Sequence, residues 1–193
     1  MSEERQKQIL EAAIAEFAQH GFHATRMEDI ARTAGLSKGA VYLYYKSKDA
    51  IIAALLRTLF AWELRGARSI LDTEGRATDR LLAMTRMFAD ELDRLAVAMP
   101  IFLEFYVVAF RQPAVREHLA EMYEEFRAPL ATLIRQGIAR GEFRAIEPEI
   151  VAISWIALLE GLTLLWVVDP HGFAWRDQAE ASVRLLLDGL LKR

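Results

Sequence analysis

The sequence predicts an all-α protein of about nine helices, with a small N-terminal helix-turn-helix domain joined to a larger helical domain. Apolar residues recur at i, i+3, i+4 spacing along most of the 193 residues, and no long segment alternates with the period of two typical of a strand. Hydrophobic residues make up 53% of the chain and only five residues are prolines, so long helices and a sizeable core are available.

The first helix is expected from about Glu4 to His20, because Ile9, Ala13 and Phe17 share one face. Gly21 follows directly and is suited to end this helix in a left-handed conformation.

A helix-turn-helix pattern then extends from Ala24 to Lys48. Thr25 and Glu28 fit the Thr-x-x-Glu capping box at the start of a short helix. Gly35 permits a left-handed turn, and Ser37 is a suitable N-cap for a second short helix that carries Val41 and Tyr44 inward. Such a unit usually lays its second helix in the major groove, so the pattern predicts DNA binding.

The remaining helices are expected in a body that begins with a long connecting helix capped by Ser47. Their expected ranges are about Lys48–Leu71, a helix from Thr78, a helix from Pro100 to before Pro113, Ala114–Arg140 with a kink at Pro129, a helix from Pro148 and a helix from Asp177. The predicted domains are therefore residues 1–50, for DNA binding, and 51–193, for ligand binding and dimerisation.

The charge distribution suits a specific reader of DNA better than a nonspecific coating protein. The net charge is −3, yet residues 36–48 carry three lysines and no acidic residue. The chain has no cysteine, which excludes disulfides and thiolate metal sites and fits a reducing compartment.

The string GLSKGAVYLYYKSKDAII, preceded by an ATRMEDIA helix, resembles the N-terminal domain of TetR-family transcriptional repressors over roughly Arg5 to Leu56. Beyond residue 60 the layout and a GEF…Glu-Gly-Leu pattern are similar to the BetI-like C-terminal subgroup. The resemblance implies a cytoplasmic homodimer on a roughly palindromic operator, released by a small molecule and needing no cofactor. A ligand-independent regulator or an activator is the alternative within this class.

The predicted DNA contacts lie in and around the second short helix. Lys38 can reach a guanine or a phosphate, and the small Gly39 and Ala40 let the backbone approach base edges. The resemblance implies phosphate contacts by tyrosine hydroxyls and by residues that begin the neighbouring helices. The full set is Thr25, Lys38, Gly39, Ala40, Tyr42, Leu43, Tyr44, Lys46 and Lys48.

Alternatives stay open for several of these residues. Tyr44 also fits an inward packing position, and Lys46 and Lys48 also fit an ordinary solvated pair. Ala40 replaces a frequent Thr or Ser of the family, and Leu43 stands where an aromatic residue or His is usual. The operator sequence therefore does not carry over from relatives, although Leu43 can pack against a thymine methyl.

Aromatic residues of the body are candidates for an effector pocket, and core packing is the alternative for each. Glu104 lies inside the apolar segment PIFLEFYVVAF, so its carboxylate faces a cationic ligand or forms a structural ion pair with an arginine. The expected effector is apolar or aromatic, with a cationic molecule as the alternative if Glu104 points into the pocket. The candidate pocket residues are Trp62, Phe88, Phe102, Glu104, Phe105, Tyr106, Tyr123, Phe126 and Trp166.

Two C-terminal helices are expected to form the dimer interface. The segment 150–168 has nineteen residues and a single charge, Glu160, which by length alone also permits a membrane span. A central carboxylate and flanks without Lys or Arg argue against a span and for a bundle or an interface. The predicted interface residues are Trp155, Leu158, Leu162, Val183, Leu186 and Leu190.

Catalysis finds little support in the sequence. The chain has no glycine-rich phosphate loop and no cysteine nucleophile. His118 and Glu121 stand three residues apart, but the chain contains no Glu-x-x-His pair of the kind that binds di-iron centres. An all-α enzyme or metal-binding bundle with an incidental helix-turn-helix remains the alternative of a different class.

Overall fold

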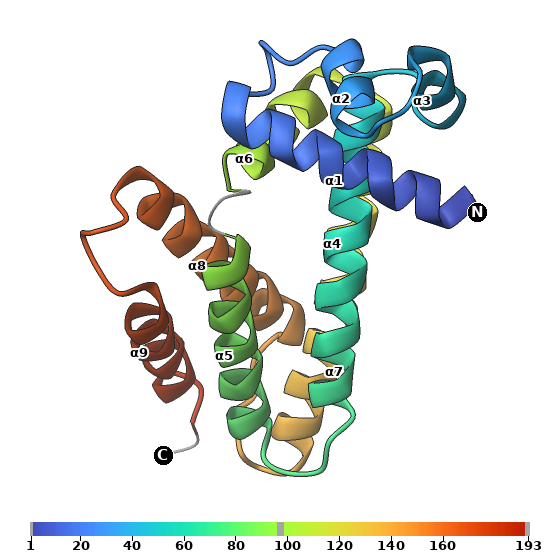
Figure 1. Ribbon diagram of the computed structural model, residues 1–193. Helices are drawn as coiled ribbons and strands as arrows, with labels where there is room; N and C mark the ends of the chain where they lie inside the picture. The colour runs from blue at the N-terminus through green and yellow to red at the C-terminus, as the bar shows by residue number, and fades with distance from the viewer. Residues whose placement is uncertain (1, 96–98, 192–193) are drawn as a thin grey trace. The chain divides into compact units, whose positions relative to one another are not determined.

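The computed structural model describes residues 2–95 and 99–191, and within them the chain forms nine α-helices and no strand (Figure 1). The helices are α1 (Ser2–His20), α2 (Met27–Thr33), α3 (Lys38–Tyr44), α4 (Lys48–Leu71), α5 (Ala77–Leu95), α6 (Met99–Arg111), α7 (Pro113–Ala139), α8 (Pro148–Val168) and α9 (Trp175–Asp188). The all-α prediction is confirmed, and the predicted helix ends agree with these bounds to within a few residues.

The chain divides into two compact units. The first unit comprises Met1–Ala61 with Leu95–Leu119, and the second comprises Trp62–Arg94 with Ala120–Arg193. Helices α4 and α7 each contribute to both units. The first unit thus contains α6 in addition to the three helices of the predicted DNA-binding domain.

The helix-turn-helix packs on α1 through a small apolar core. Ile9 and Ala13 of α1, Ile30 of α2 and Val41 of α3 have no exposed surface. The side-chain amide of Gln8 also donates to the carbonyl oxygen of Ala34 at 2.6 Å, which satisfies an acceptor at the end of α2. Apolar burial and this polar contact together hold the short helices α2 and α3, which are too short to be stable alone.

Two glycines end helices of this unit as expected. Gly21 has φ +78° after α1, and Gly35 has φ +64° between α2 and α3. Both values lie in the left-handed region that a side chain disfavours, so each glycine sets the direction of the following segment.

The predicted capping box at the start of α2 is wrong by one residue. Arg26 is the N-cap, and its backbone N–H donates to a carboxylate oxygen of Asp29 at 3.0 Å. The hydroxyl of Thr25 instead donates to the carbonyl oxygens of Gly21 at 2.8 Å and Glu16 at 3.2 Å. Thr25 therefore joins the loop to the end of α1. The carboxylate that caps α2 is that of Asp29, and Glu28 has no capping role.

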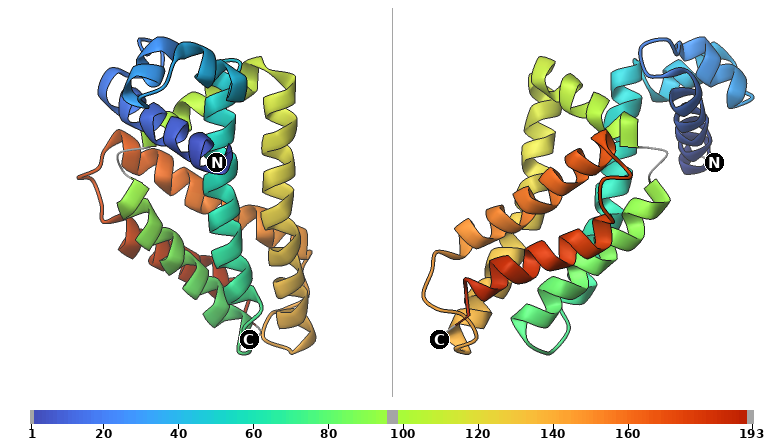
Figure 2. Two further views of the ribbon diagram at one scale, coloured as in Figure 1. Left: turned by 45° about the vertical axis from the view of Figure 1, so that its right-hand side comes forward. Right: turned by 90° about the vertical axis from the view of Figure 1, so that its left-hand side faces the viewer.

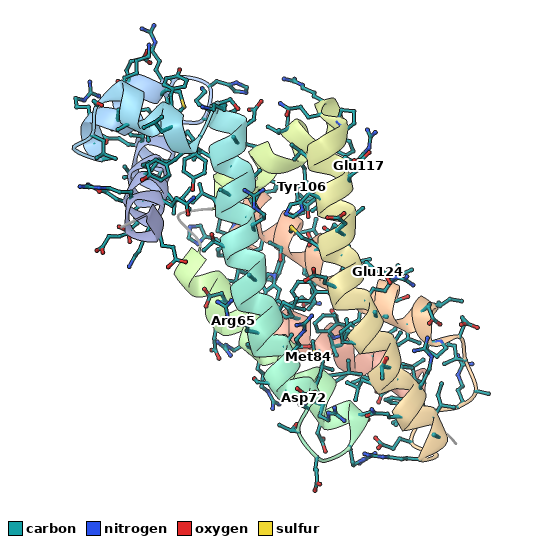
Figure 3. All side chains as sticks on the ribbon, turned by 90° about the vertical axis from the view of Figure 1, so that its right-hand side faces the viewer. Arg65, Asp72, Met84, Tyr106, Glu117 and Glu124 are labelled. Carbon is teal, nitrogen blue, oxygen red and sulfur yellow. The ribbon has the colours of Figure 1, made fainter. Side chains whose placement is uncertain are left out.

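The second unit is organised around α8 and α9, which run side by side (Figure 2). Val151, Trp155 and Leu159 of α8 and Val183 and Leu187 of α9 are buried. Within this unit Met84 lies in the packed interior, whereas Asp72 and Glu124 point outward (Figure 3).

The Gly-Glu-Phe segment after α7 is a corner that joins three parts of the second unit. Gly141, with φ +74°, ends α7. A carboxylate oxygen of Glu142 accepts the backbone N–H of Ala77 at 2.8 Å and so caps α5. Phe143 is 2% exposed and forms an isolated antiparallel bridge with Leu191 near the C-terminus.

The ring of Phe143 also lies against the backbone of α7. A Cβ atom at Gly137 would come within 2.4 Å of this ring, so only glycine allows the approach. The Gly-Glu-Phe pattern therefore has a structural role, because it ties the ends of α5, α7 and α9 together.

Candidate nucleic-acid interface

Helix α3 is held so that one side packs inward and the other is open to solvent. The Ser37 side chain accepts the Ala40 backbone N–H at 3.2 Å, which confirms the predicted N-cap. Val41 is fully buried, whereas Leu43 is 78% exposed. Lys38 and Gly39 are exposed as well, so the predicted base-contacting residues share an accessible surface at the start and outer side of α3.

Lys38 is engaged with Glu28, a residue that the sequence pattern indicated only as part of a capping box. Its ammonium forms an ion pair with the carboxylate of Glu28 on α2, and it lies 5.7 Å from the centre of the Tyr42 ring. The hydrogen bond to Lys38 lowers the pKa of Glu28, and the same bond raises the pKa of Lys38. Both groups therefore stay charged at neutral pH.

The tyrosines at the end of α3 divide their roles differently from the prediction. Tyr45 is the buried one, whereas Tyr42 and Tyr44 are half-buried. The tyrosine that packs inward is therefore Tyr45, and Tyr44, which was predicted to do so, is only half-buried. The Lys46 ammonium donates to the carbonyl oxygen of Tyr42 at 2.9 Å and so satisfies an acceptor in the last turn of α3.

Lys48 holds the loop between α1 and α2 in addition to lying at the start of α4. Its ammonium donates to the carbonyl oxygens of Phe22 and His23 and lies 4.5 Å from the centre of the Phe22 ring. Burial lowers the pKa of Lys48 from its usual value. Lys48 is therefore no freely solvated partner of Lys46, and its charge stabilises the loop that leads into α2.

The predicted phosphate contact of Lys48 is tested by Lys48→Ala, which would weaken binding to specific and random DNA by similar factors, because a phosphate contact carries no sequence information. The slope of log K against log salt should fall by about one. Loss of the two carbonyl contacts should also lower the free energy of unfolding by about 1 kcal/mol. Fluorescence anisotropy over a salt series and thermal unfolding measure these effects.

The matched control is Lys7→Ala, which removes one exposed charge from α1. This control should leave the salt slope nearly unchanged. Relaxed base preference at one operator position in Lys48→Ala would contradict the phosphate assignment.

Thr25, another predicted phosphate contact, is 1% exposed, and its hydroxyl donates inside the unit as described above. Its backbone N–H is also engaged, with the carbonyl oxygen of Gly21 at 3.3 Å, so Thr25 has almost no surface left for an outside partner. The sequence motif alone did not distinguish this internal role from a surface one.

Helix α6 contacts the same loop within the first unit. The imidazole Nε2 of His23 lies 3.5 Å from the Glu104 carboxylate, and the Gln112 side chain donates to Asp49 at the start of α4. The ion-pair alternative for Glu104 therefore has His23 as its partner, when the imidazole is protonated, rather than an arginine. Tyr106, also on α6, is half-buried.

Part of the predicted effector pocket is an aromatic cluster in the second unit. The Phe88 ring lies 5.6 Å from the Trp155 ring and 6.1 Å from the Phe126 ring, measured between centroids. Nearby in sequence, the Tyr123 hydroxyl donates to the Glu160 carboxylate at 3.1 Å. Trp166 is half-buried at the end of α8, whereas the side chains of Trp62, Phe102 and Phe105 lie outside the described residues.

The residues predicted for the dimer interface fall into two groups. Trp155, Val183 and Leu190 are at most 3% exposed in the single chain, so their side chains already belong to its own core. Leu158, Leu162 and Leu186 are half-buried. The large apolar residues of α8 and α9 that are exposed in the single chain are Ile150, Ile153, Leu164, Leu165, Val168 and Leu185.

Helix α8 is long and apolar enough to cross a membrane, with a mean hydropathy of 2.1, and is the only such helix among the described residues. Of its apolar window 22% is buried, and the buried side, which carries Val151, Trp155 and Leu159, packs within the second unit. Across the same residues no group of three His, Asp or Glu side chains is arranged to hold a metal ion.

Comparison with known proteins places these features in one family. Residues 9–55 match the model of bacterial regulatory proteins of the tetR family, and residues 77–192 match the C-terminal model of BetI-type transcriptional repressors. The uncharacterised HTH-type transcriptional regulator YfiR of Bacillus subtilis (strain 168) is 31% identical over 149 residues, which cover 76% of this chain and 71% of that protein.

Two solved structures have closely similar folds. A transcriptional regulator from Pseudomonas aeruginosa PAO1 has a TM-score of 0.85 at 29% identity, covering 98% of this chain and 91% of that one. A regulator from Saccharomonospora viridis, solved in complex with choline, has a TM-score of 0.85 at 24% identity and full coverage of both chains. The relatives are named as regulators rather than enzymes, and the chain belongs to the TetR family of transcriptional regulators, with a BetI-type C-terminal domain.

Proposed function

We propose that this protein is a cytoplasmic, ligand-responsive repressor that binds a roughly palindromic operator as a homodimer and leaves it when a small molecule binds. The observation that carries the proposal is the outer side of α3, where Lys38, Gly39 and Leu43 are exposed on a helix anchored by Val41. A short, rigidly anchored helix with such a surface fits the major groove.

The dimer is supported by a stripe of exposed residues along α8. Ile150, Ile153, Leu164 and Val168 lie on one side of the helix, since their spacing of three, eleven and four residues matches the helical repeat. Gly161 lies on the same side, and nothing lies within 4 Å of a Cβ atom built there. A partner helix can therefore approach closely, and a two-fold axis would place the same stripe on both sides of the interface.

The effector site is proposed around the aromatic cluster of Phe88, Phe126 and Trp155 with the Tyr123–Glu160 hydrogen bond beside it in sequence. Ligand sites of this kind combine apolar walls with a few polar anchors, so an apolar or aromatic molecule is expected. The Saccharomonospora viridis regulator that holds choline shares the fold with this chain, which supports a small-molecule site in such a body.

Release from the operator follows from linkage. A ligand that binds more tightly to a state with low operator affinity shifts the protein toward that state, by no more than its differential affinity for the two states. Helix α6 belongs to the same compact unit as the helix-turn-helix and contacts its loop through Glu104 and His23. A change in α6 would therefore alter the surroundings of the segment that leads into α2.

The proposal is tested by selecting binding sites for the purified protein from a random DNA library. We expect an inverted repeat, bound with two protein chains per site in sedimentation analysis. The selected site is then used in a displacement screen with apolar, aromatic and cationic small molecules, and at least one class should lower its affinity. A library that yields no enriched sequence would refute DNA recognition, whereas an enriched site that no ligand weakens would refute ligand response alone.

A further inference from the structure

The Glu28–Lys38 ion pair joins the two helices of the helix-turn-helix at their exposed side. Glu28 is the second residue of α2 and Lys38 is the first residue of α3, and about half of each side chain is exposed. Both charged ends are therefore at the surface where the start of α3 would meet a base pair.

Among the nearby charges, Arg26 also acts on Glu28 and helps to lower its pKa, whereas Asp29 does not compete for Lys38. Asp29 is engaged with the backbone N–H of Arg26 and with the guanidinium of Arg32 at 2.9 Å. Residues Gly39 and Ala40, which follow Lys38, have side chains too small to cover the pair. Lys38 is also the only basic residue of α3, so any contact of α3 that needs a positively charged side chain depends on this ammonium.

The pair has the donors and acceptors that a G·C base pair requires in the major groove. Guanine presents the acceptors O6 and N7, and cytosine presents the donor N4 amino group. An ammonium has three N–H donors and a carboxylate has about four lone-pair sites, so each group keeps capacity after pairing with the other. The two contacts can therefore form without breaking the ion pair.

We propose that Glu28 and Lys38 act together as one reader of a G·C base pair, with Lys38 donating to guanine and Glu28 accepting from the cytosine N4 amino group. This inference rests on the proposed DNA recognition and adds a base-specific role for α2. Glu28 also limits nonspecific binding, because a phosphate must compete with a carboxylate for Lys38 and is repelled by that carboxylate.

The first test compares E28Q with the unmodified protein by site selection and by competition between operators changed at one base pair. The unmodified protein should prefer G·C at one position of each half-site by roughly 5- to 150-fold, the range for a good base contact. E28Q should reduce this preference to a few fold and keep the others. It should also bind random DNA more tightly, with a salt slope steeper by about one for each freed Lys38.

The matched control is E11Q, which removes an exposed carboxylate that pairs with Lys7 on α1 of the same unit. It changes the net charge equally but should leave the preference at every position unchanged. If E11Q and E28Q change operator and random DNA binding alike, the effect is general electrostatics and the proposal is overturned.

The second test is the exchanged pair, E28K/K38E, which keeps the ion pair and the net charge while reversing the donor and the acceptor. This variant should shift the preference at the same position from G·C toward C·G with little change in salt slope. Selection of the original base pair by the folded double variant would overturn the proposal. A library that enriches nothing with the unmodified protein would overturn DNA recognition and this inference together.

Discussion

Ile153→Glu is expected to convert the proposed dimer into a monomer or an aggregate. Ile153 is 53% exposed in the single chain and belongs to the apolar stripe of α8, near the N-terminal end of that helix, where a partner would cover it. Burying a carboxylate without a partner costs several kcal/mol, and each 1.4 kcal/mol changes the dissociation constant tenfold. The dimer should therefore weaken by roughly 100-fold or more in sedimentation equilibrium.

The affinity for the full operator should also decrease when the dimer dissociates. Two linked DNA-binding domains bind an inverted repeat about 10²- to 10⁴-fold more tightly than one domain does, and a monomer loses this gain. Binding of the variant to a single half-site should be unaffected, because Ile153 is no part of α3. Anisotropy measurements with full and half operators separate these two effects.

The matched control is Leu43→Glu, which places the same charge on an exposed leucine of α3. This variant should remain a dimer while losing operator affinity. An unmodified protein that sediments as a well-folded monomer at micromolar concentration would contradict the interface proposal, as would an unchanged dimer in Ile153→Glu.

Phe143→Ala is expected to lower the free energy of unfolding by about 3–5 kcal/mol, the range for removing a buried phenylalanine ring. The ring is almost fully buried, packs on the backbone of α7 at Gly137 and carries the bridge to Leu191. For a chain of this size the melting temperature should fall by about 6–20 °C. Calorimetry at a fixed protein concentration measures the change.

The control for this prediction is Phe110→Ala, since Phe110 on α6 is 78% exposed and the chemical change is identical. Its effect on the free energy of unfolding should stay within about 0.5 kcal/mol. Similar losses in the two variants would show that Phe143 is not the corner that holds α5, α7 and α9 together.

Features that depend on neighbouring residues in the chain could be predicted from the sequence. The left-handed turn at Gly35, the Ser37 cap and the buried Val41 follow from local backbone sterics, one hydrogen bond over three residues and helical periodicity. The start of α8 at Pro148 follows in the same way, because proline is accepted at the first turn of a helix.

The internal contacts of the predicted DNA-binding residues could not be predicted, because a linear pattern does not show which segments lie beside one another. Thr25 fits a capping box by spacing, yet its hydroxyl binds carbonyls at the end of α1 because that segment lies beside it. The partners of Lys38 and Lys48 are likewise found only after the turn brings α2 and the preceding loop next to them. Local spacing predicted which side chains are functional candidates but not what they bind within the protein.

For helix α8 the sequence determined the helix itself, whereas the tertiary structure determined which of its apolar residues are buried. The sequence by itself determined that Pro148–Val168 is a long helix that is apolar on almost every side. Because almost every side is apolar, no periodicity distinguishes a core side from an exposed one. Only packing within the second unit decided that Trp155 faces inward and Ile153 faces outward, since burial depends on which neighbouring helices cover each side.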